Sequence, residues 1–327
     1  MNTEKKKIVA IINPISGIRP KDNLPKLIRE QIDSNKFDIE IVFTEYAGHA
    51  TEIAHKAVAD KIDYVLAIGG DGTINETAKA LIHSDTALGI IPLGSGNGLA
   101  RHLEIPLETS KALKIINEEN VVSIDYCKAN DYIFFCTAGL GFDAWISKKF
   151  AEDKHRGGLT YIKNVLAEYL RYEPRYYKIV TEQGTVVEKA FLVACANASQ
   201  YGNNAYIAPG ANMQDGLMDI TVLRPFNHLE APVLSVQLFT KQLPKNSKIQ
   251  TIRDKSVKII LDKEEVMHVD GEPIMMGKEI FVKTYPAGLK ILVPTNPSHS
   301  IIEPLQHVIE EIHYNIVSDI KDVFSRK

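Results

Sequence analysis

Long apolar runs, metal-binding cysteine patterns and a strong net charge are all missing from this chain of 327 residues. No stretch reaches the roughly 18 apolar residues that a membrane-spanning helix needs, so any membrane contact would be peripheral. Cys127, Cys136 and Cys195 lack the spacing of metal ligands and are expected to be buried thiols in a reducing compartment. A net charge of -3 argues against a nucleic-acid partner.

The N-terminal segment also lacks the features of a signal peptide. Only five apolar residues follow the first basic residues before Asn13, too few for a hydrophobic signal region, so this segment predicts a first β-strand. We therefore expect a cytoplasmic protein whose only membrane contact is peripheral, at the inner membrane surface. The length exceeds what one core usually serves and predicts two domains.

Residues 64–81, YVLAIGGDGTINETAKAL, combine an apolar strand, a glycine-rich turn and a helical pattern. This order places backbone N–H groups and a helix N-terminus where they can bind an anion. Glycines let the anion approach the backbone closely, because they have no Cβ. The Asp71 carboxylate would repel a bare phosphate. A carboxylate at this position is compatible with phosphate binding if Mg²⁺ lies between the carboxylate and the phosphate. It is also compatible if Asp71 interacts with a hydroxyl group that becomes phosphorylated. The alternative is an ordinary strand-to-helix turn without a ligand.

Strands and helices alternate along the first third of the chain. Apolar runs at 8–12, 38–44, 64–68 and 87–92 predict strands, and 21–32, 48–59 and 74–81 predict helices. This alternation is typical of a parallel sheet with helices on both faces, which binds ligands at the carboxyl ends of its strands. Three such ends carry polar or glycine-rich loops, at 13–17, 69–73 and 94–97.

The pattern changes after about residue 123, where short strand-like runs dominate and turn signals separate them. This pattern is typical of an all-β sandwich. The runs lie at 132–136, 177–181, 190–194, 219–223, 257–260, 279–284 and 289–293, with helical pieces near 144–150, 159–170 and 229–238. We predict an α/β domain over 1–123, a β-sandwich domain over 124–297 and a C-terminal segment over 298–327.

The C-terminal segment predicts an amphipathic helix over 301–324. Its polar face is mainly acidic, which an anionic membrane would not favour, so packing on the protein itself or on a homodimer partner is the preferred interpretation. The apolar stripe consists of Leu305, Val308, Ile309, Ile312, Ile316, Ile320 and Val323.

Seven motifs, in this order along the chain, resemble those of the diacylglycerol kinase catalytic-domain family, which includes bacterial diacylglycerol kinases and eukaryotic sphingosine and ceramide kinases. GGDGT alone would be shared with NAD kinases, whereas the later motifs are specific to the lipid kinases. The motifs are NPISG (13–17), TEYAGHA (44–50), GGDGTINE (69–76), PLGSGNGLAR (92–101), GLGFDA (139–144), DGLMDI (215–220) and VDGEP (269–273).

The resemblance implies a Rossmann-like nucleotide domain, a β-sandwich lipid domain and an active site between them. It implies transfer of the γ-phosphoryl group of ATP to a lipid hydroxyl, with Mg²⁺ on the ATP phosphates beside Asp71. The family often has Thr where Ser95 stands, so the hydroxyl is kept. The resemblance and the position of the loops at the strand ends both point to a set of expected ATP-binding residues. These are Asn13, Pro14, Ser16, Gly17, Thr44, Gly69, Gly70, Gly72, Thr73, Asn75, Glu76, Ser95 and Asn97.

Glu272 is the expected general base, since a carboxylate behind the Asp270-Gly271 turn can take the proton of the lipid hydroxyl. The alternative is a simple hairpin turn with a solvated flank. By resemblance, Asp215 binds a structural Mg²⁺ together with backbone carbonyls near Asn212 and Leu217, and an Asp-Gly turn without metal is the alternative.

Residues 139–144, GLGFDA, also satisfy a dinucleotide fingerprint, but they lie in the β-rich half and have no ribose-binding acid about 20 residues further on. We interpret them as a crossing loop of the lipid domain. Asp143 is expected to meet the polar head of the acceptor, and an aminated head such as a sphingoid base would favour this carboxylate. The alternative is a helix N-cap for 144–150.

Three functions remain open from the sequence. The leading hypothesis is an ATP-dependent lipid kinase. The sequence GSGNGLA at 94–100 favours long-chain bases as the substrate, while diacylglycerol or another lipid alcohol stays open. The second is an NAD kinase, against which the motifs at 215–220 and 269–273 argue. The third is a catalytically silent nucleotide- or lipid-binding regulator, against which the intact Asp71 and Glu272 argue.

Overall fold

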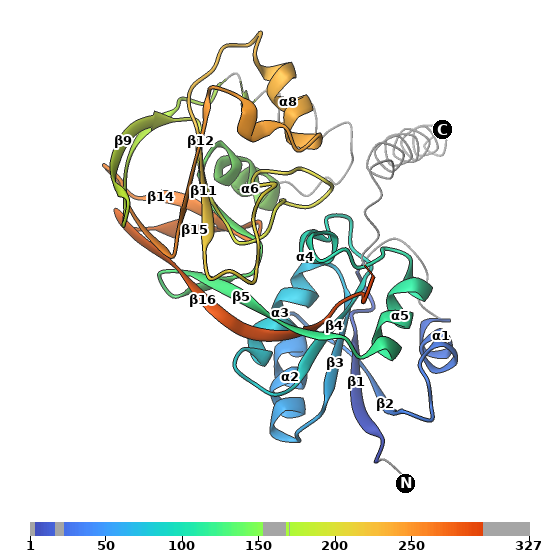
Figure 1. Ribbon diagram of the computed structural model, residues 1–327. Helices are drawn as coiled ribbons and strands as arrows, with labels where there is room; N and C mark the ends of the chain where they lie inside the picture. Colours follow the sequence, from blue (N-terminus) through green and yellow to red (C-terminus); the bar gives the residue numbers. More distant parts are fainter. Residues whose placement is uncertain (1–3, 17–22, 153–167, 170, 297–327) are drawn as a thin grey trace.

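The computed structural model of the chain describes residues 4–16, 23–152, 168–169 and 171–296 (Figure 1). Gly17, most of the predicted helix at 159–170 and the predicted tail helix lie outside the described residues. Among the described helices, none is both long enough and apolar enough to cross a bilayer.

The N-terminal part is an α/β unit around a parallel sheet, as the sequence predicted. Four strands follow the order β2-β1-β3-β4, and Figure 1 shows α2 and α3 on one face of them and α1 and α5 on the other. Every residue of β3 and β4 is buried, as expected for strands covered on both faces. The elements are β1 (Lys6–Ile12), α1 (Leu24–Gln31), β2 (Phe37–Phe43), α2 (His49–Ala59), β3 (Tyr64–Gly69), α3 (Asp71–Leu81), β4 (Ala87–Pro92), α4 (Gly98–His102) and α5 (Thr109–Glu118).

The C-terminal part is an antiparallel β-sandwich, which confirms the second fold prediction. One layer is the six-stranded sheet β12-β11-β10-β7-β14-β15, and the other consists of β5, β6, β8, β9, β13 and β16. The strands are β5 (Val121–Ala129), β6 (Tyr132–Phe134), β7 (Thr137–Gly141), β8 (Arg175–Thr181), β9 (Gly184–Ala190), β10 (Leu192–Ala196), β11 (Met218–Leu223), β12 (Ile249–Asp254), β13 (Ser256–Ile260), β14 (Glu265–Val269), β15 (Glu272–Met276) and β16 (Glu279–Leu292).

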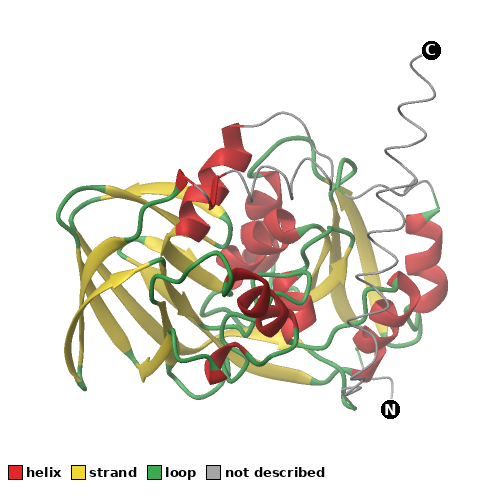
Figure 2. Cartoon of the chain, turned by 90° about the horizontal axis from the view of Figure 1, so that it is seen from above, coloured by secondary structure: helices red, strands yellow, loops and turns green. Residues whose placement is uncertain are grey.

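Buried apolar side chains from both layers fill the space between them, among them Tyr177 and Met267. The outer face of the six-stranded sheet is covered by α6 (Phe142–Glu152), α8 (Ala231–Phe239) and the short 3-10 helix η1 (Leu243–Lys245). Figure 2 shows the sandwich strands gathered at one end of the molecule, with most helices in the middle and at the other end.

Strand β16 joins the two parts. It pairs with β13 and β5 of the sandwich and ends beside β4, where Ile291 faces Leu88 in parallel register. The sequence predicted two strands here, at 279–284 and 289–293. They form one strand whose register shifts between Tyr285 and Leu289, because a bulge at the turn residues interrupts the hydrophobic alternation without ending the pairing.

The predicted crossing loop at 139–144 is wrong. Residues 137–141 form β7, a fully buried central strand, and α6 begins at Phe142. Glycine content suggested a loop, but Gly139 and Gly141 are required by close packing: a Cβ at Gly139 would lie 2.3 Å from the Asp143 carboxylate. Helix α3 also begins at Asp71, three residues earlier than predicted.

Gly89 tests the packing between β4 and its neighbours. A Cβ at this position would lie 2.4 Å from Leu66 Cδ2 and 3.0 Å from Ile116 Cδ1, so Gly89→Ala forces the core to shift. We expect a loss of about 1–3 kcal/mol in the free energy of unfolding, measured by urea denaturation. Gly277→Ala, where a Cβ would meet nothing within 4 Å, is the matched control. Equal stabilities of the two variants would contradict the packing.

Candidate functional site

Three loops meet at the carboxyl ends of β1, β3 and β4, as the sequence predicted. The Asn13 N–H donates to the Ile68 carbonyl (3.1 Å), and the Leu93 N–H donates to the Gly69 carbonyl (2.8 Å). The backbones of Gly70 and Gly94 approach so closely that a Cβ at Gly94 would lie 2.8 Å from Gly70 Cα. The three loops therefore form one polar rim at the edge of the parallel sheet.

The Asp71 carboxylate holds two of these loops together. Its Oδ2 accepts the Asn97 N–H and its Oδ1 accepts the Gly98 N–H, each at 2.8 Å. Gly96 has no room for a side chain, because a Cβ there would lie 2.8 Å from Asp71 Oδ2. Each carboxylate oxygen keeps a second lone pair, so Asp71 can also contact a nucleotide-bound Mg²⁺, directly or through water.

Side-chain contacts fix the other loops of the rim. Asn13 Nδ2 donates to Thr73 Oγ1 (3.0 Å), which ties the loop after β1 to the first turn of α3. Glu76 Oε1 accepts the Gly48 N–H (3.1 Å), which ties α3 to the start of α2. The remaining expected ATP-site residues lie at the same edge of the sheet: Thr44 follows β2, Ser16 and the exposed Pro14 follow β1, Gly72 is the second residue of α3, and the exposed Ser95 follows β4.

A carboxylate of the sandwich domain reaches this rim. Asp270, in the turn between β14 and β15, accepts the successive N–H groups of Phe135, Cys136 and Thr137 at 2.8 to 2.9 Å. Asn75 Nδ2 of α3 donates to the same carboxylate (3.3 Å) across the domain interface. Burial raises the pKa of Asp270 above its usual range, and the three N–H groups oppose that rise.

Glu272, the expected general base, is the first residue of β15 and is exposed. It stands two residues beyond Asp270, so the Asn75–Asp270 contact brings its strand next to the helix that begins at Asp71. A single hydrogen bond thus places the hairpin of Glu272 beside the glycine-rich rim.

Asp143, the expected head-group contact, lies at the start of α6. Its Oδ2 accepts the Tyr201 O–H (2.9 Å) and lies 3.1 Å from His268 Nε2, and its Oδ1 accepts the Ala144 N–H (2.8 Å). A carboxylate only accepts hydrogen bonds, so the His268 Nε2 carries the proton. Burial, with a further contribution from Asp143, raises the pKa of Tyr201 well above its usual range.

The expected structural Mg²⁺ ligand Asp215 has a cation already. Its carboxylate pairs with the Arg253 guanidinium and accepts the Leu217 N–H (3.0 Å), while Asn212 Oδ1 accepts the Gln214 N–H (3.0 Å). No cluster of three acidic, His or Cys side chains suited to a metal occurs among the described residues. Because Arg253 occupies the Asp215 carboxylate in this structure, no step of a reaction is assigned to a metal here, and the ligand set of Asp215, Asn212 and Leu217 stays a prediction.

A second contact joins the domains behind the rim. The Ser199 N–H donates to His102 Nδ1 (3.1 Å), and Ser199 Oγ lies 3.0 Å from the same nitrogen. The Asn203 N–H donates to the Gly96 carbonyl (3.2 Å). Burial, together with the nearby charge of Lys241, lowers the pKa of His102 to about 4.

Sequence reasoning missed three residues of this arrangement, namely Asp270, His268 and Tyr201. Asp270 lies within the motif at 269–273, where the pattern indicated only a turn before Glu272, and His268 directly precedes that motif. Tyr201 carries no sequence signal, because its partner Asp143 is 58 residues away.

Comparisons with known proteins agree with this geometry. Residues 7–129 match the family model described as diacylglycerol kinase catalytic domain, and residues 136–293 match the YegS C-terminal NAD kinase beta sandwich-like domain. A protein of Klebsiella pneumoniae named "Probable lipid kinase YegS-like" is 30% identical over 263 residues, covering 79% of this chain and 86% of that protein. The chain belongs to the diacylglycerol kinase catalytic-domain family.

Two further comparisons concern a sequence relative and a solved structure of the same fold. The protein of Escherichia coli (strain SMS-3-5 / SECEC) named "Probable lipid kinase YegS" is 29% identical over 285 residues, covering 84% of this chain and 92% of that protein. A crystal structure of a diacylglycerol kinase from Bacillus anthracis has a TM-score of 0.71 at 22% identity, covering 90% of this chain and 100% of that one. This last likeness shows that the two chains share a fold.

Asp71→Asn tests the carboxylate that joins the loops. The amide offers one oxygen in place of two, so one backbone N–H loses its acceptor, at a cost of roughly 1.5–3 kcal/mol. We expect ATP affinity, measured by calorimetry, to fall roughly tenfold or more, since 1.4 kcal/mol corresponds to a factor of ten. Asp85→Asn, which removes only the surface pair with Lys290 at 2.7 Å, should leave affinity unchanged. Unaltered ATP affinity in Asp71→Asn would refute this role.

His102 predicts a pH-dependent contribution to stability. Its pKa is about 4 in the folded protein and near 6.5 unfolded, so its contribution is complete above pH 6.5 and is lost as the pH falls toward 4. His102→Asn keeps an acceptor for the Ser199 N–H but does not titrate. Its free energy of unfolding should therefore fall less over this window than that of wild type, by about 1–3 kcal/mol. His55→Gln, at an exposed position of α2, is the control and should follow wild type.

Proposed function

We propose that this chain transfers the γ-phosphoryl group of ATP to the hydroxyl of a lipid, either a diacylglycerol or a sphingoid base, with Glu272 as general base. The observation that carries the proposal is the hydrogen bond between Asn75 and Asp270. It joins the helix of the glycine-rich rim to the hairpin of the candidate base, so both halves of a phosphoryl-transfer site lie at one interface.

The rim supplies the donor half of the site. The loops after β3 and β4 and the N-terminus of α3 lie together at the carboxyl edge of the parallel sheet, where the ATP phosphates bind in this proposal. Phosphoryl transfer depends mainly on positioning and on stabilising charge, and both need a rigid rim. The contacts of Asn13 with Thr73, and of Asp71 with Asn97 and Gly98, provide that rigidity. Mg²⁺ on the phosphates would neutralise their charge beside Asp71.

The hairpin supplies the acceptor half. Glu272 projects from the first position of β15, whose register is fixed by the pairing of Glu272 with Val269 on β14. The Glu272 carboxylate accepts the proton of the lipid hydroxyl as that oxygen attacks the γ-phosphorus. Asp143 contacts the polar head of the lipid through Oδ1. This oxygen accepts one hydrogen bond from the protein, whereas Oδ2 accepts two.

Glu272→Gln removes the base and keeps the shape. We expect turnover to fall roughly 100-fold or more, the usual range for a general base, with ATP affinity unchanged. The assay follows labelled phosphate from ATP to sphinganine, ceramide, diacylglycerol, monoacylglycerol or undecaprenol in mixed micelles, with NAD as a soluble acceptor for comparison. Turnover within a few-fold of wild type would show that Glu272 is not the base.

Asp270→Asn separates the base from the residue that positions the hairpin. The amide cannot accept all the N–H groups that face Asp270, so we expect a lower unfolding temperature as well as lower turnover. Glu272→Gln, at an exposed position, should keep the wild-type unfolding temperature. Loss of turnover in Asp270→Asn alone, at wild-type stability, would assign the base to Asp270. Labelled NAD without any labelled lipid would overturn the proposed lipid kinase.

A further inference from the structure

Helix α8 is apolar on almost every side and yet stands at the surface. Its sequence, APVLSVQLF, contains no charged residue. A helix of this kind is normally buried on all sides. Here only Leu234 is buried, whereas Val233, Val236 and Phe239 are 54%, 62% and 45% exposed, and Leu229 just before the helix is 88% exposed. We call these four exposed side chains the α8 apolar face.

Positive charge flanks the α8 apolar face. Between Asn227 and Lys248 the chain has three lysines and one glutamate, although the whole chain has a net charge of -3. The glutamate, Glu230, pairs with Lys248 at 3.7 Å. The exposed Lys241 and Lys245 therefore give this end of the molecule a local positive charge, and Lys241 Nζ lies 4.6 Å from the ring centroid of Tyr206.

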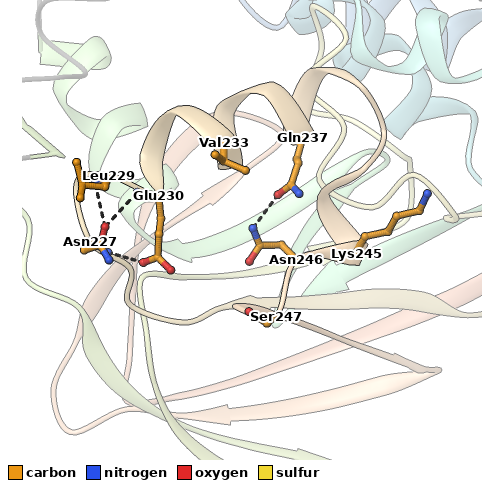
Figure 3. A pocket seen from close by; sticks show the side chains of 8 residues that line it. All are labelled: Asn227, Leu229, Glu230, Val233, Gln237, Lys245, Asn246 and Ser247. Atoms are coloured by element: carbon orange, nitrogen blue, oxygen red, sulfur yellow. Dashed lines mark hydrogen bonds between the residues drawn. The ribbon is translucent and has the colours of Figure 1, made fainter.

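A hollow lined by polar side chains and by Leu229 and Val233 of the α8 apolar face borders the same helix. Figure 3 shows Glu230, Val233 and Gln237 along the side of α8 that faces Lys245 and Asn246, and the hollow between them has a volume of about 490 Å³. Asn246 Nδ2 donates to Gln237 Oε1 at 2.7 Å across it. Apolar residues thus give way to polar and cationic ones within one helix width, which is the profile of a segment lying at a membrane–water interface.

The helix is also tied to the candidate site. The Tyr206 N–H donates to the Leu238 carbonyl of α8 (2.9 Å), so α8 is bonded to the loop that also contains Tyr201. Tyr201 in turn donates to Asp143 (2.9 Å), the candidate head-group contact. A surface that holds α8 in the plane of a bilayer would therefore bring the acceptor half of the site close to the lipid head groups.

We propose that the α8 apolar face docks on an anionic lipid bilayer, with Leu229, Val233, Val236 and Phe239 entering the head-group boundary and Lys241 and Lys245 meeting anionic head groups. This inference rests on the proposed lipid kinase function and adds its partner surface. The positive charge of the two lysines is the reason for proposing an anionic bilayer as the partner of the α8 apolar face, because lysines bind an anionic bilayer better than a neutral one.

The experiment is sedimentation of the full chain with vesicles of equal parts phosphatidylcholine and phosphatidylglycerol, without ATP, beside vesicles of phosphatidylcholine alone. Val233→Asp with Val236→Asp should lower the partition coefficient at least about tenfold, since each buried methylene contributes roughly 0.8 kcal/mol. The matched control is Tyr176→Asp with Val187→Asp, which changes two side chains of similar exposure (66% and 63%) on β8 and β9.

A second variant, Lys241→Glu with Lys245→Glu, keeps the helix sequence and reverses the flanking charge. It should abolish the preference for the anionic vesicles, so the inference stays testable if aspartates in α8 disturb folding. Equal binding of wild type and both variants, or no binding by wild type, would overturn the proposal. A shift from dimer to monomer in the Val233→Asp and Val236→Asp variant, with vesicle binding unchanged, would overturn it in favour of a second copy.

Turnover on a short-chain lipid that is soluble as monomers separates this inference from the proposed function. The Val233→Asp and Val236→Asp variant that loses vesicle binding should keep wild-type turnover on this acceptor, because both side chains lie on the exposed part of α8. Wild type that binds anionic vesicles through the α8 apolar face but phosphorylates no lipid would refute the kinase function and leave the docking surface standing.

Discussion

The Asp270 carboxylate is the interaction on which the candidate site depends. It lies in a tight turn, at a positive φ of 47°, and gathers three successive N–H groups of the β6–β7 connection together with Asn75 of the other domain. Burying a carboxylate is costly, and here backbone donors offset that cost. Asp270 therefore connects the start of β7, the hairpin of Glu272 and helix α3, in addition to the backbone pairing of β14 with β7 and β15.

Strand β16, which pairs with strands of both domains, stabilises the relative position of the two domains. Because it runs without a break from the sandwich to the edge of β4, the two domains belong to one ten-stranded sheet. Asp125 supports the bulge of this strand by accepting the Ala287 N–H (2.8 Å), and its other oxygen accepts the Gly216 N–H (2.7 Å). At this join the two domains are therefore connected by a paired strand and not by a loop.

Sequence patterns predicted the strands that form clear apolar runs and missed others, among them the fully buried β7, whose glycines indicated a loop. The parallel strands β3 and β4 are apolar throughout and were predicted, as was the meeting of the loops that follow them at one edge of the sheet. Strands β14 and β15, EVMHV and EPIMM, carry charged residues and a proline, so local propensity gave no strand. The contact between Asn75 and Asp270 spans 195 positions, and only the folded sheet brings these residues together.

The surroundings of Asp143 limit what this residue can select. Oδ2 already receives Tyr201 and His268, which uses both of its lone pairs, and Oδ1 receives the Ala144 N–H. One lone pair of Oδ1 is left for a lipid head group, enough for a single hydrogen bond. A hydroxyl and an ammonium group can both donate that bond, and the ammonium gains from the carboxylate charge. In the proposed lipid kinase, a preference between a diacylglycerol and a sphingoid base would therefore come largely from the other side chains around the head group.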